Sequence, residues 1–321
     1  MGRFIVRRAL FGIVVLAVIS FAVFVLFFVV APGDVAGNFC GKGCTPERLA
    51  QIRKLYHLDQ PWYDQYVLYV KRLVLHADFG YSFTNSQSVR AILIDRAPAT
   101  ISLALGAAVV WLGMGIPIGI LAATKPRSLR DRAATVFALA GLSIPTFVLG
   151  LVFIYLFFYQ LTIHGFAFFP GNGYVPLTED PVAWTKHLIL PWFTLAIVSA
   201  ASYSRITRGS LLEVLGEDYI RTARAKGLSE RRVIYRHGLR SALTPVVTLL
   251  GIDVGTLLGG AIVTEQVFGL QGIGQTAVQA VVNGDLPIIF GTVLFAAFFI
   301  VVANIFVDIA YALLDARVRL S

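Results

Sequence analysis

Apolar residues run along this chain in long, nearly unbroken stretches instead of alternating with polar residues. Six stretches are long enough to cross about 30 Å of hydrocarbon as helices of about 20 residues. We place them at 10–31, 98–124, 133–160, 187–204, 243–264 and 287–313. The core of a water-soluble protein could not hide so much apolar surface. The pattern therefore predicts an all-α membrane protein with six transmembrane helices.

The first apolar stretch is expected to remain as a membrane helix. Arg3, Arg7 and Arg8 precede it, and it is longer than the apolar region of a signal peptide. No cleavage site of the small-x-small type follows before Pro32. The stretch at 187–204 is the weakest of the six because three serines lower its hydrophobicity.

Composition and charge support a membrane protein and indicate its orientation. The 321 residues are 57% hydrophobic and only 14% charged, with a net charge of +9. Of the 27 Lys and Arg, 18 lie before the first span, in 125–132, in 205–240 or after residue 313. Positively charged segments stay in the cytoplasm, so we expect both termini inside. This orientation accounts for the basic charge, with membrane lipid as the expected contact and no nucleic-acid partner.

The long segment between the first two spans is then extracytoplasmic. Residues 47–57 and 62–75 carry apolar side chains at helical spacing, which predicts two short helices at the outer membrane interface. They could cap the helix bundle or contact a ligand. Cys40 and Cys44 are separated by two glycines and a lysine, and in an oxidising compartment they could form a short disulfide or remain free. A metal site is less favoured because structural zinc usually needs four ligands.

The sequence lacks the motifs of a catalytic subunit. No G-x-x-x-x-G-K-[ST] motif occurs, and the glycine-rich run 269–274 lacks the lysine that contacts phosphates. The five histidines are dispersed and form no metal-binding or nucleophilic pattern. We therefore expect no ATP hydrolysis, no metal site and no enzymatic activity in this chain.

The basic segment 205–240 has the pattern of a docking element. Four apolar residues recur along it at the spacing of one helical face. They are Leu212, Leu215, Tyr219 and Ala223. Gly227 interrupts the helical pattern, and Ser229 is placed to cap a second helix that starts at Glu230. Two short helices joined by a glycine turn could enter a cleft on a partner, or the basic segment could rest on anionic lipid headgroups.

The same segment carries a family resemblance. The run from Asp218 to Ser229, continued by 233–245, resembles the EAA loop of ABC importer permeases. Further similar runs lie at 58–61, 65–66, 78–82, 96–100, 141–147 and 260–274. Over nearly its whole length the chain resembles the B-type permease subunit of the oligopeptide, dipeptide and nickel importers.

The resemblance implies an architecture and a set of partners. It implies a type I ABC importer permease in the plasma membrane that passes short peptides inward, with ATP and Mg²⁺ bound by partner subunits and no cofactor bound by this chain. Those partners are a second homologous permease, two cytoplasmic ATPases and an extracytoplasmic peptide-binding protein. We expect an N-terminal helix with an outer segment at 1–96, a five-helix core at 97–314 and a cytoplasmic tail at 315–321.

The resemblance also implies that the EAA-like run couples the permease to the ATPase. The expected coupling residues are Asp218, Tyr219, Arg221, Thr222, Ala223, Arg224, Ala225, Lys226, Gly227, Leu228 and Ser229. Ala223, Gly227 and Leu239 match the alanine, the glycine and the late leucine of the motif. Arg221 and Arg240 stand where the consensus has glutamate and proline. A salt bridge made by that glutamate therefore cannot be transferred to this chain.

Two acids lie within predicted spans and are candidates for the translocation pathway. Asp253 lies among Gly251, Gly255 and Gly259, so it could line a pathway or bond a helix packed on a glycine seam. Asp308 lies near the inner end of the last span, where a helix–helix hydrogen bond is favoured over a pathway role.

A third candidate, Glu265, follows the fifth span and could attract the amino terminus of a peptide, contact a docking protein or simply be solvated. A different class of function stays open at this point, namely an ion-coupled secondary transporter that uses Asp253 and Asp308. Within the importer class, nickel or another small solute is an alternative to peptides, because pocket shape decides the substrate.

Overall fold

A computed structural model describes residues 2–30, 36–37, 45–82 and 84–314. In this part of the chain nearly all regular structure is helical. The described residues also form a short antiparallel hairpin, in which β1 (Tyr81–Ser82) pairs with β2 (Gln87–Ser88). Cys40 and Cys44 lie outside the described residues, so the disulfide remains an expectation.

Long helices form the body of the molecule. They are α1 (Gly2–Phe24) with η1 (Val25–Val30), α5 (Val89–Thr124), α6 (Leu129–Ser143), α7 (Thr146–Phe153) with η2 (Ile154–Gln160) and α8 (Leu161–Ile163), α9 (Pro181–Leu215), α13 (Thr244–Leu258) and α16 (Leu286–Leu314). The shorter helices are α3 (Pro46–Tyr56), α4 (Trp62–His76), α10 (Asp218–Ala225), α11 (Glu230–Arg232), η3 (Val233–Gly238), α12 (Leu239–Ala242), α14 (Ile262–Val267) and α15 (Ile273–Asn283).

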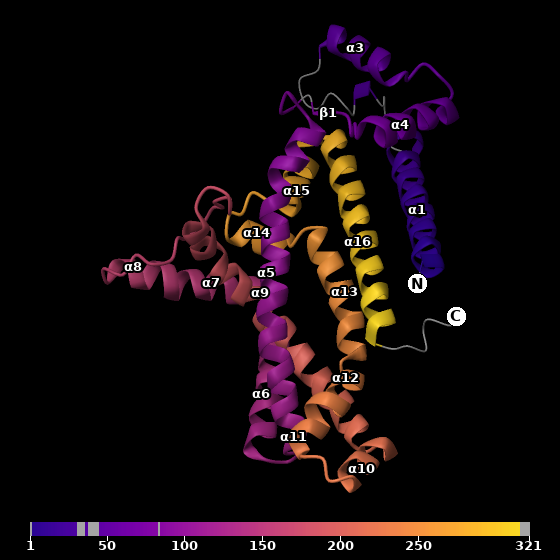
Figure 1. The fold of residues 1–321 in the computed structure, drawn as a ribbon. Helices are drawn as coiled ribbons and strands as arrows, with labels where there is room; N and C mark the ends of the chain where they lie inside the picture. The colour runs from indigo at the N-terminus through magenta and orange to yellow at the C-terminus, as the bar shows by residue number, and fades with distance from the viewer. Residues whose placement is uncertain (1, 31–35, 38–44, 83, 315–321) are drawn as a thin grey trace.

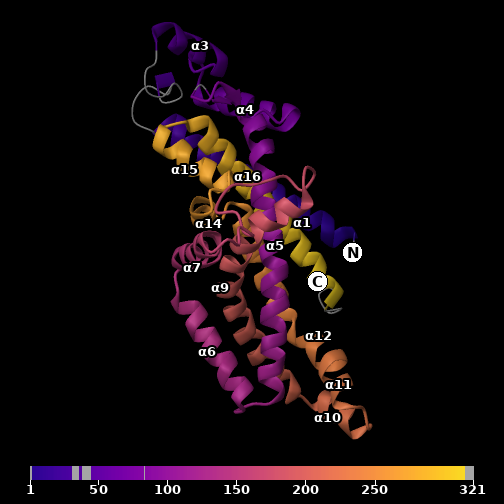
Figure 2. The same cartoon turned by 90° about the vertical axis from the view of Figure 1, so that its left-hand side faces the viewer.

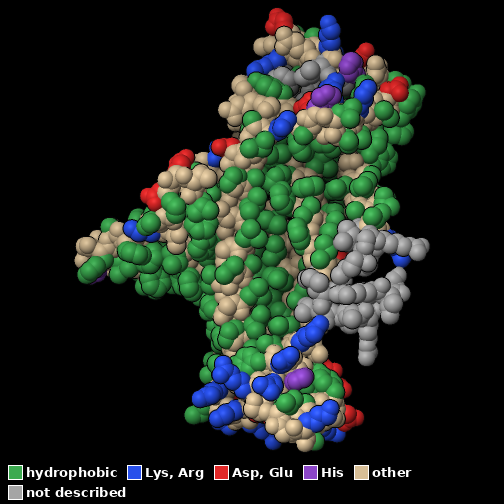
Figure 3. Space-filling view, in the orientation of Figure 1, with side chains coloured by type: hydrophobic (Ala, Val, Ile, Leu, Met, Phe, Trp, Pro, Cys, Tyr) green, Lys and Arg blue, Asp and Glu red, His purple; other side chains and the backbone are tan. Residues whose placement is uncertain are grey.

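The arrangement has two distinct ends. Figure 1 shows α5, α9, α13 and α16 side by side, with α3, α4 and the hairpin at one end and α10 and α11 at the other. We call these the α3 end and the α10 end. The turned view in Figure 2 keeps the same two groups at opposite ends. Figure 3 shows a mostly hydrophobic surface between the ends and many Lys and Arg side chains at the α10 end. This distribution is typical of a membrane protein.

Among the described residues, five helices are long and apolar enough to span a membrane, and a sixth span results if one bent pair counts as one. That pair joins 230–242 to α13 at an angle of 49°. The predicted span at 133–160 is wrong as a single helix, because it breaks between α6 and α7. Pro145 has no N–H and disfavours helical geometry in the residue before it, so Ile144 is extended with φ −94° and ψ 121°.

Small residues allow the central helices to approach closely. A Cβ added at Gly115 or Gly119 of α5 would lie within 2.8 Å of a side-chain atom of α9. On α13, a Cβ at Gly255 would touch Ile300 and Ala303 of α16, and one at Gly251 would clash with Val307. The glycine row around Asp253 therefore packs α13 against α16. This is the glycine seam between helices that one of the two sequence interpretations of Asp253 predicted.

The two short helices predicted at 47–57 and 62–75 are confirmed almost to the residue, since they correspond to α3 and α4. The α4 helix lies on the end of α1, where the hydroxyls of Ser20 and Tyr66 are 3.0 Å apart. Phe21 packs edge-on against the ring of Tyr66. Tyr63, Val67 and Val74 remain more than half exposed on one face of α4.

Candidate functional site

The segment 216–238 forms a bent helical unit at the α10 end, which we call the elbow. The α9 helix ends at Leu215, and α10 starts at Asp218 after an extended residue, Glu217. Gly227 has φ +75°, a left-handed conformation that glycine adopts without strain. The predicted glycine break and the helix start at Glu230 are therefore confirmed, whereas Ser229 takes the N-cap position without a side-chain hydrogen bond.

The inner face of the elbow is a small apolar core. Ile220, Ala223 and Val233 are buried, and Leu215 and Leu228 pack beside them. The predicted stripe on one continuous helix is wrong, because the chain turns at Gly216 and the helical phase changes there. The residues Leu212 and Leu215 consequently belong to α9, while on α10 the side chain of Ile220 is buried and that of Tyr219 is exposed.

An ion pair holds the two arms of the elbow together. Arg224 donates through Nε and Nη2 to the two carboxylate oxygens of Glu230, at 3.1 and 2.8 Å. A third nitrogen of the same guanidinium donates to the carbonyl of Leu215 at 3.4 Å. The pair raises the pKa of Arg224, which stays charged. Because both groups are partly exposed, the pair stabilises the shape of the elbow by about 1 kcal/mol or less.

The outer face of the elbow is basic and carries exposed aromatic rings. Tyr219 is 46% exposed and Tyr235 is 54% exposed. Arg221, at the consensus glutamate position, pairs with Asp218 on the same helix at 3.0 Å. Lys226 is exposed at the turn. Exposed Tyr and Arg side chains are the residues that most often carry binding energy in protein interfaces.

Side-chain packing connects the elbow to the body. Ile234 and Ala242 are buried with Leu211 of α9 and with Ile120 and Ala123 of α5. Close-packed interiors transmit displacement because they have little free volume. The elbow is therefore packed against the ends of α5 and α9, and α12 joins it to α13.

An ion pair that sequence reasoning missed joins α6 to α9 near the elbow. The Arg208 guanidinium donates to both oxygens of Asp131, at 2.5 and 2.9 Å, and the Arg127 amide donates to one of them at 2.8 Å. Asp131 is 6% exposed. The hydrogen bonds from Arg208 and then from the Arg127 amide lower its pKa. The signal in the sequence was that Asp131 is the single acid within the basic run 125–132.

The three acids proposed for the pathway lie in different environments, and each contacts a different helix. Asp253 is half-buried and accepts a hydrogen bond of 2.8 Å from Tyr203 of α9, which is 1% exposed. Its position is at the edge of an exposed stripe of α13 that includes Ile252 and Thr256. Asp308 instead forms an ion pair of 3.2 Å with Arg8 of α1.

Glu265 has no solvent-accessible surface. One carboxylate oxygen accepts the Thr100 hydroxyl of α5 at 2.7 Å, and the other accepts the Gln275 amide of α15 at 2.8 Å. The carboxylate thus connects three helices and does not face solvent in this conformation.

Comparisons with known proteins agree with this geometry. The family of binding-protein-dependent transport system inner membrane components matches residues 115–320, and the N-terminal region of such membrane components matches 1–104. The chain is 40% identical to a putative peptide transport system permease protein of Brucella abortus and 38% identical to the dipeptide transport system permease protein DppB of Escherichia coli, each over 99% of both chains. The fold resembles a chain of the inward-facing MetNI methionine ABC transporter, with a TM-score of 0.55 and 18% identity over 70% of this chain and 97% of that one.

Proposed function

Because the chain belongs to the family of binding-protein-dependent transport system inner membrane components, we propose that it is the permease subunit of an ATP-driven importer of short peptides. The observation that carries this proposal is full-length similarity, at 38–40% identity, to proteins named as peptide and dipeptide permeases. The described part of the chain has five or six apolar spans, as a multi-pass protein of the inner membrane requires.

The proposed partners are a second permease, two ATPases and an extracytoplasmic peptide-binding protein. The excess of Lys and Arg at the α10 end supports a cytoplasmic elbow, and the elbow then becomes the contact with an ATPase. Its exposed tyrosines and its ion-paired shape suit a groove on a folded partner. ATP and Mg²⁺ bind the ATPases in this proposal, and this chain performs no chemistry.

Alternating access is the proposed mechanism. ATP closes the paired ATPases and moves the elbow with them, and the packing of Ile234 and Leu211 passes the motion to α5, α9 and α13. The bundle then opens its cavity to the outside. ATP can drive this change only if the elbow makes different contacts with the ATPase in the two states.

Of the three candidate acids, Asp253 is the one we assign to the translocation pathway. Its partial exposure on α13 supports this role. Glu265 is buried and Asp308 is paired with Arg8, so we assign both to contacts between helices.

Reconstitution of the assembled transporter in proteoliposomes tests the proposed function. We expect uptake of radiolabelled dialanine that requires ATP inside the vesicle and the binding protein outside it. Vesicles loaded with a non-hydrolysable ATP analogue are the control and should show no uptake. Uptake that follows a proton gradient without any ATPase would identify a secondary transporter, and uptake of nickel without peptide would identify a different substrate.

A further inference from the structure

A polar cavity of about 400 Å³ opens near the α3 end of the molecule. Its walls are the first turns of α5, the hairpin, and α15 with the segment that leads into it. Its volume lies within the range of ligand sites in proteins, roughly 300–1,000 Å³. No residue of this cavity belongs to the elbow or to the acids discussed above.

The lining is unusual for so apolar a chain, because only Ile92 has an apolar side chain there. Five lining residues are carboxamides: Asn85, Gln87, Gln271, Gln275 and Gln279. Four of the nine glutamines in the whole sequence thus meet in one cavity. Gln275 and Gln279 are one helical turn apart and lie on the same face of α15.

A carboxamide carries both N–H donors and a carbonyl acceptor, as a peptide bond does. Several carboxamides in one cavity can therefore pair with the main chain of an extended peptide whatever its side chains are. Main-chain hydrogen bonds give affinity without sequence preference in other modes of peptide recognition. An importer that accepts many peptide sequences needs this kind of contact.

The cavity also offers charges of both signs. Asp95 is 72% exposed at its side chain, and Arg96 lies next to it with Nε 3.3 Å from an Asp95 carboxylate oxygen. Free peptides carry an ammonium group and a carboxylate, and either terminus can contact the residue of opposite charge in this pair. Arg96 also donates to the side-chain carbonyl oxygen of Gln271. The NH₂ group of the same side chain can then donate to another partner.

Hydrogen bonds to Thr100 anchor the segment that leads into α15 beside the cavity, which lowers the entropy cost of binding. The Thr100 hydroxyl donates to Glu265 and accepts the Ile273 amide at 2.8 Å. A Cβ at Gly272 would lie 2.5 Å from both Glu265 and Thr100, so only glycine fits between the loop and α5. Buried Glu265 thereby fixes the start of α15 and with it Gln275.

We propose that this carboxamide-lined cavity receives the main chain of the incoming peptide at the outer mouth of the permease. The inference rests on the proposed function as a peptide importer. The binding protein delivers the peptide, and the cavity holds it by main-chain hydrogen bonds before the bundle changes conformation.

Uptake by the complete transporter tests the cavity. The variant combines Gln275→Leu with Gln279→Leu, and Gln160→Leu on η2 is the matched control outside the cavity. We measure uptake of radiolabelled trialanine against the concentration of peptide-loaded binding protein. Loss of two hydrogen bonds should lower the saturating uptake rate about tenfold in the double variant and leave the half-saturating concentration unchanged.

Two results of the uptake experiment would overturn the proposal. The double variant could match the control, or it could raise only the half-saturating concentration of binding protein, which would make the cavity a docking surface for that protein. If the double variant does not assemble, a benzophenone amino acid at position 279 replaces it, with position 160 as the control. Capture of labelled trialanine at 279 and not at 160 supports the proposal, and capture of the binding protein alone, or of nothing, rejects it.

The wild-type transporter separates the two levels of inference. If it takes up no peptide under any condition, the proposed function fails. If it takes up peptide and the cavity variants behave as the control does, only the role of the cavity fails.

Discussion

At the scale of single residues, Asp253 shows how a charge inside a span can be positioned for function. The glycine row packs against α16, whereas Asp253 points to Tyr203 on α9. We expect Asp253→Asn to lower peptide uptake per assembled transporter about tenfold, because the neutral amide loses the charge-assisted hydrogen bond to a peptide ammonium group. Uptake in proteoliposomes, divided by the amount of assembled complex, measures the effect.

Asp308→Asn is the matched control for that change. It removes an equal charge from another span, but its partner is Arg8 of α1, so uptake per assembled complex should stay within about twofold of the wild type. Equal uptake by Asp253→Asn and the wild type would contradict a pathway role. The sequence identified the three acids but not their side-chain partners, because Tyr203, Thr100 and Arg8 lie 50 to 300 residues away in the sequence.

At the scale of elements, the sequence located most helices and the turn at Gly227, but it missed two other places where the chain turns. The length of the apolar stretches predicted α1, α5, α9 and α16, and the helical spacing of apolar residues predicted α3 and α4. The turn at Gly216 was missed because the apolar spacing continues across it, and the break at Pro145 was missed because the apolar stretch is continuous there. The cavity near the α3 end was missed because its walls come from three separate segments.

The turn at Gly227 allows a sharp test of the elbow. A Cβ at this position meets no atom within 4 Å, so a substitution acts through backbone strain alone. We expect Gly227→Val to cost about 1–2 kcal/mol of strain in the left-handed conformation and to displace α11 relative to α10. The number of peptides imported per ATP hydrolysed should then fall about fivefold or more, as measured by parallel uptake and phosphate release.

Gly209→Val on α9 is the control, because that glycine is helical, has φ below zero and also has open space around it. Its coupling ratio should match the wild type. If Gly227→Val keeps both normal uptake and normal association with the ATPase, the elbow is not the coupling element.

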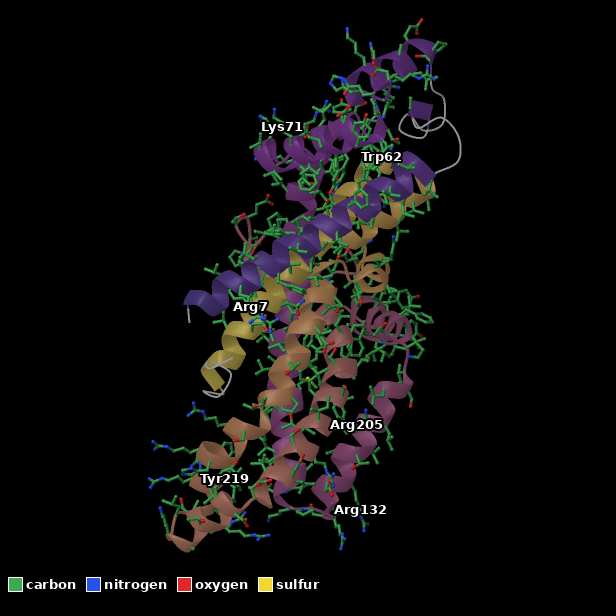
Figure 4. All side chains as sticks on the ribbon, turned by 90° about the vertical axis from the view of Figure 1, so that its right-hand side faces the viewer. Arg7, Trp62, Lys71, Arg132, Arg205 and Tyr219 are labelled. Atoms are coloured by element: carbon green, nitrogen blue, oxygen red, sulfur yellow. The ribbon has the colours of Figure 1, made fainter. Side chains whose placement is uncertain are left out.

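At the scale of the whole molecule, the charge asymmetry predicts an orientation that can be measured. Figure 4 shows Arg132 and Tyr219 at one end and Trp62 and Lys71 at the other. The α3 end should face outward and the α10 end inward, since transmembrane proteins retain Lys and Arg on the cytoplasmic side. The N-terminus lies on the same side of the membrane as the elbow only if the chain crosses the membrane an even number of times between them.

Cysteine labelling measures on which side of the membrane each end of the molecule lies. After replacement of Cys40 and Cys44 by serine, the changes Arg7→Cys, Lys54→Cys and Lys226→Cys each place one thiol at an exposed position. A membrane-impermeant maleimide should label the thiol at 54 in intact cells and those at 7 and 226 only in inverted vesicles. The thiols at 7 and 226 share a side only if the broken pair α6 and α7 crosses the membrane once. In 146–163 just 6% of the apolar window is buried by the rest of the chain, so this segment has the exposed apolar surface that such a crossing presents to lipid. Labelling at 226 from the outside would remove the elbow from the reach of any ATPase and reject the proposed mechanism.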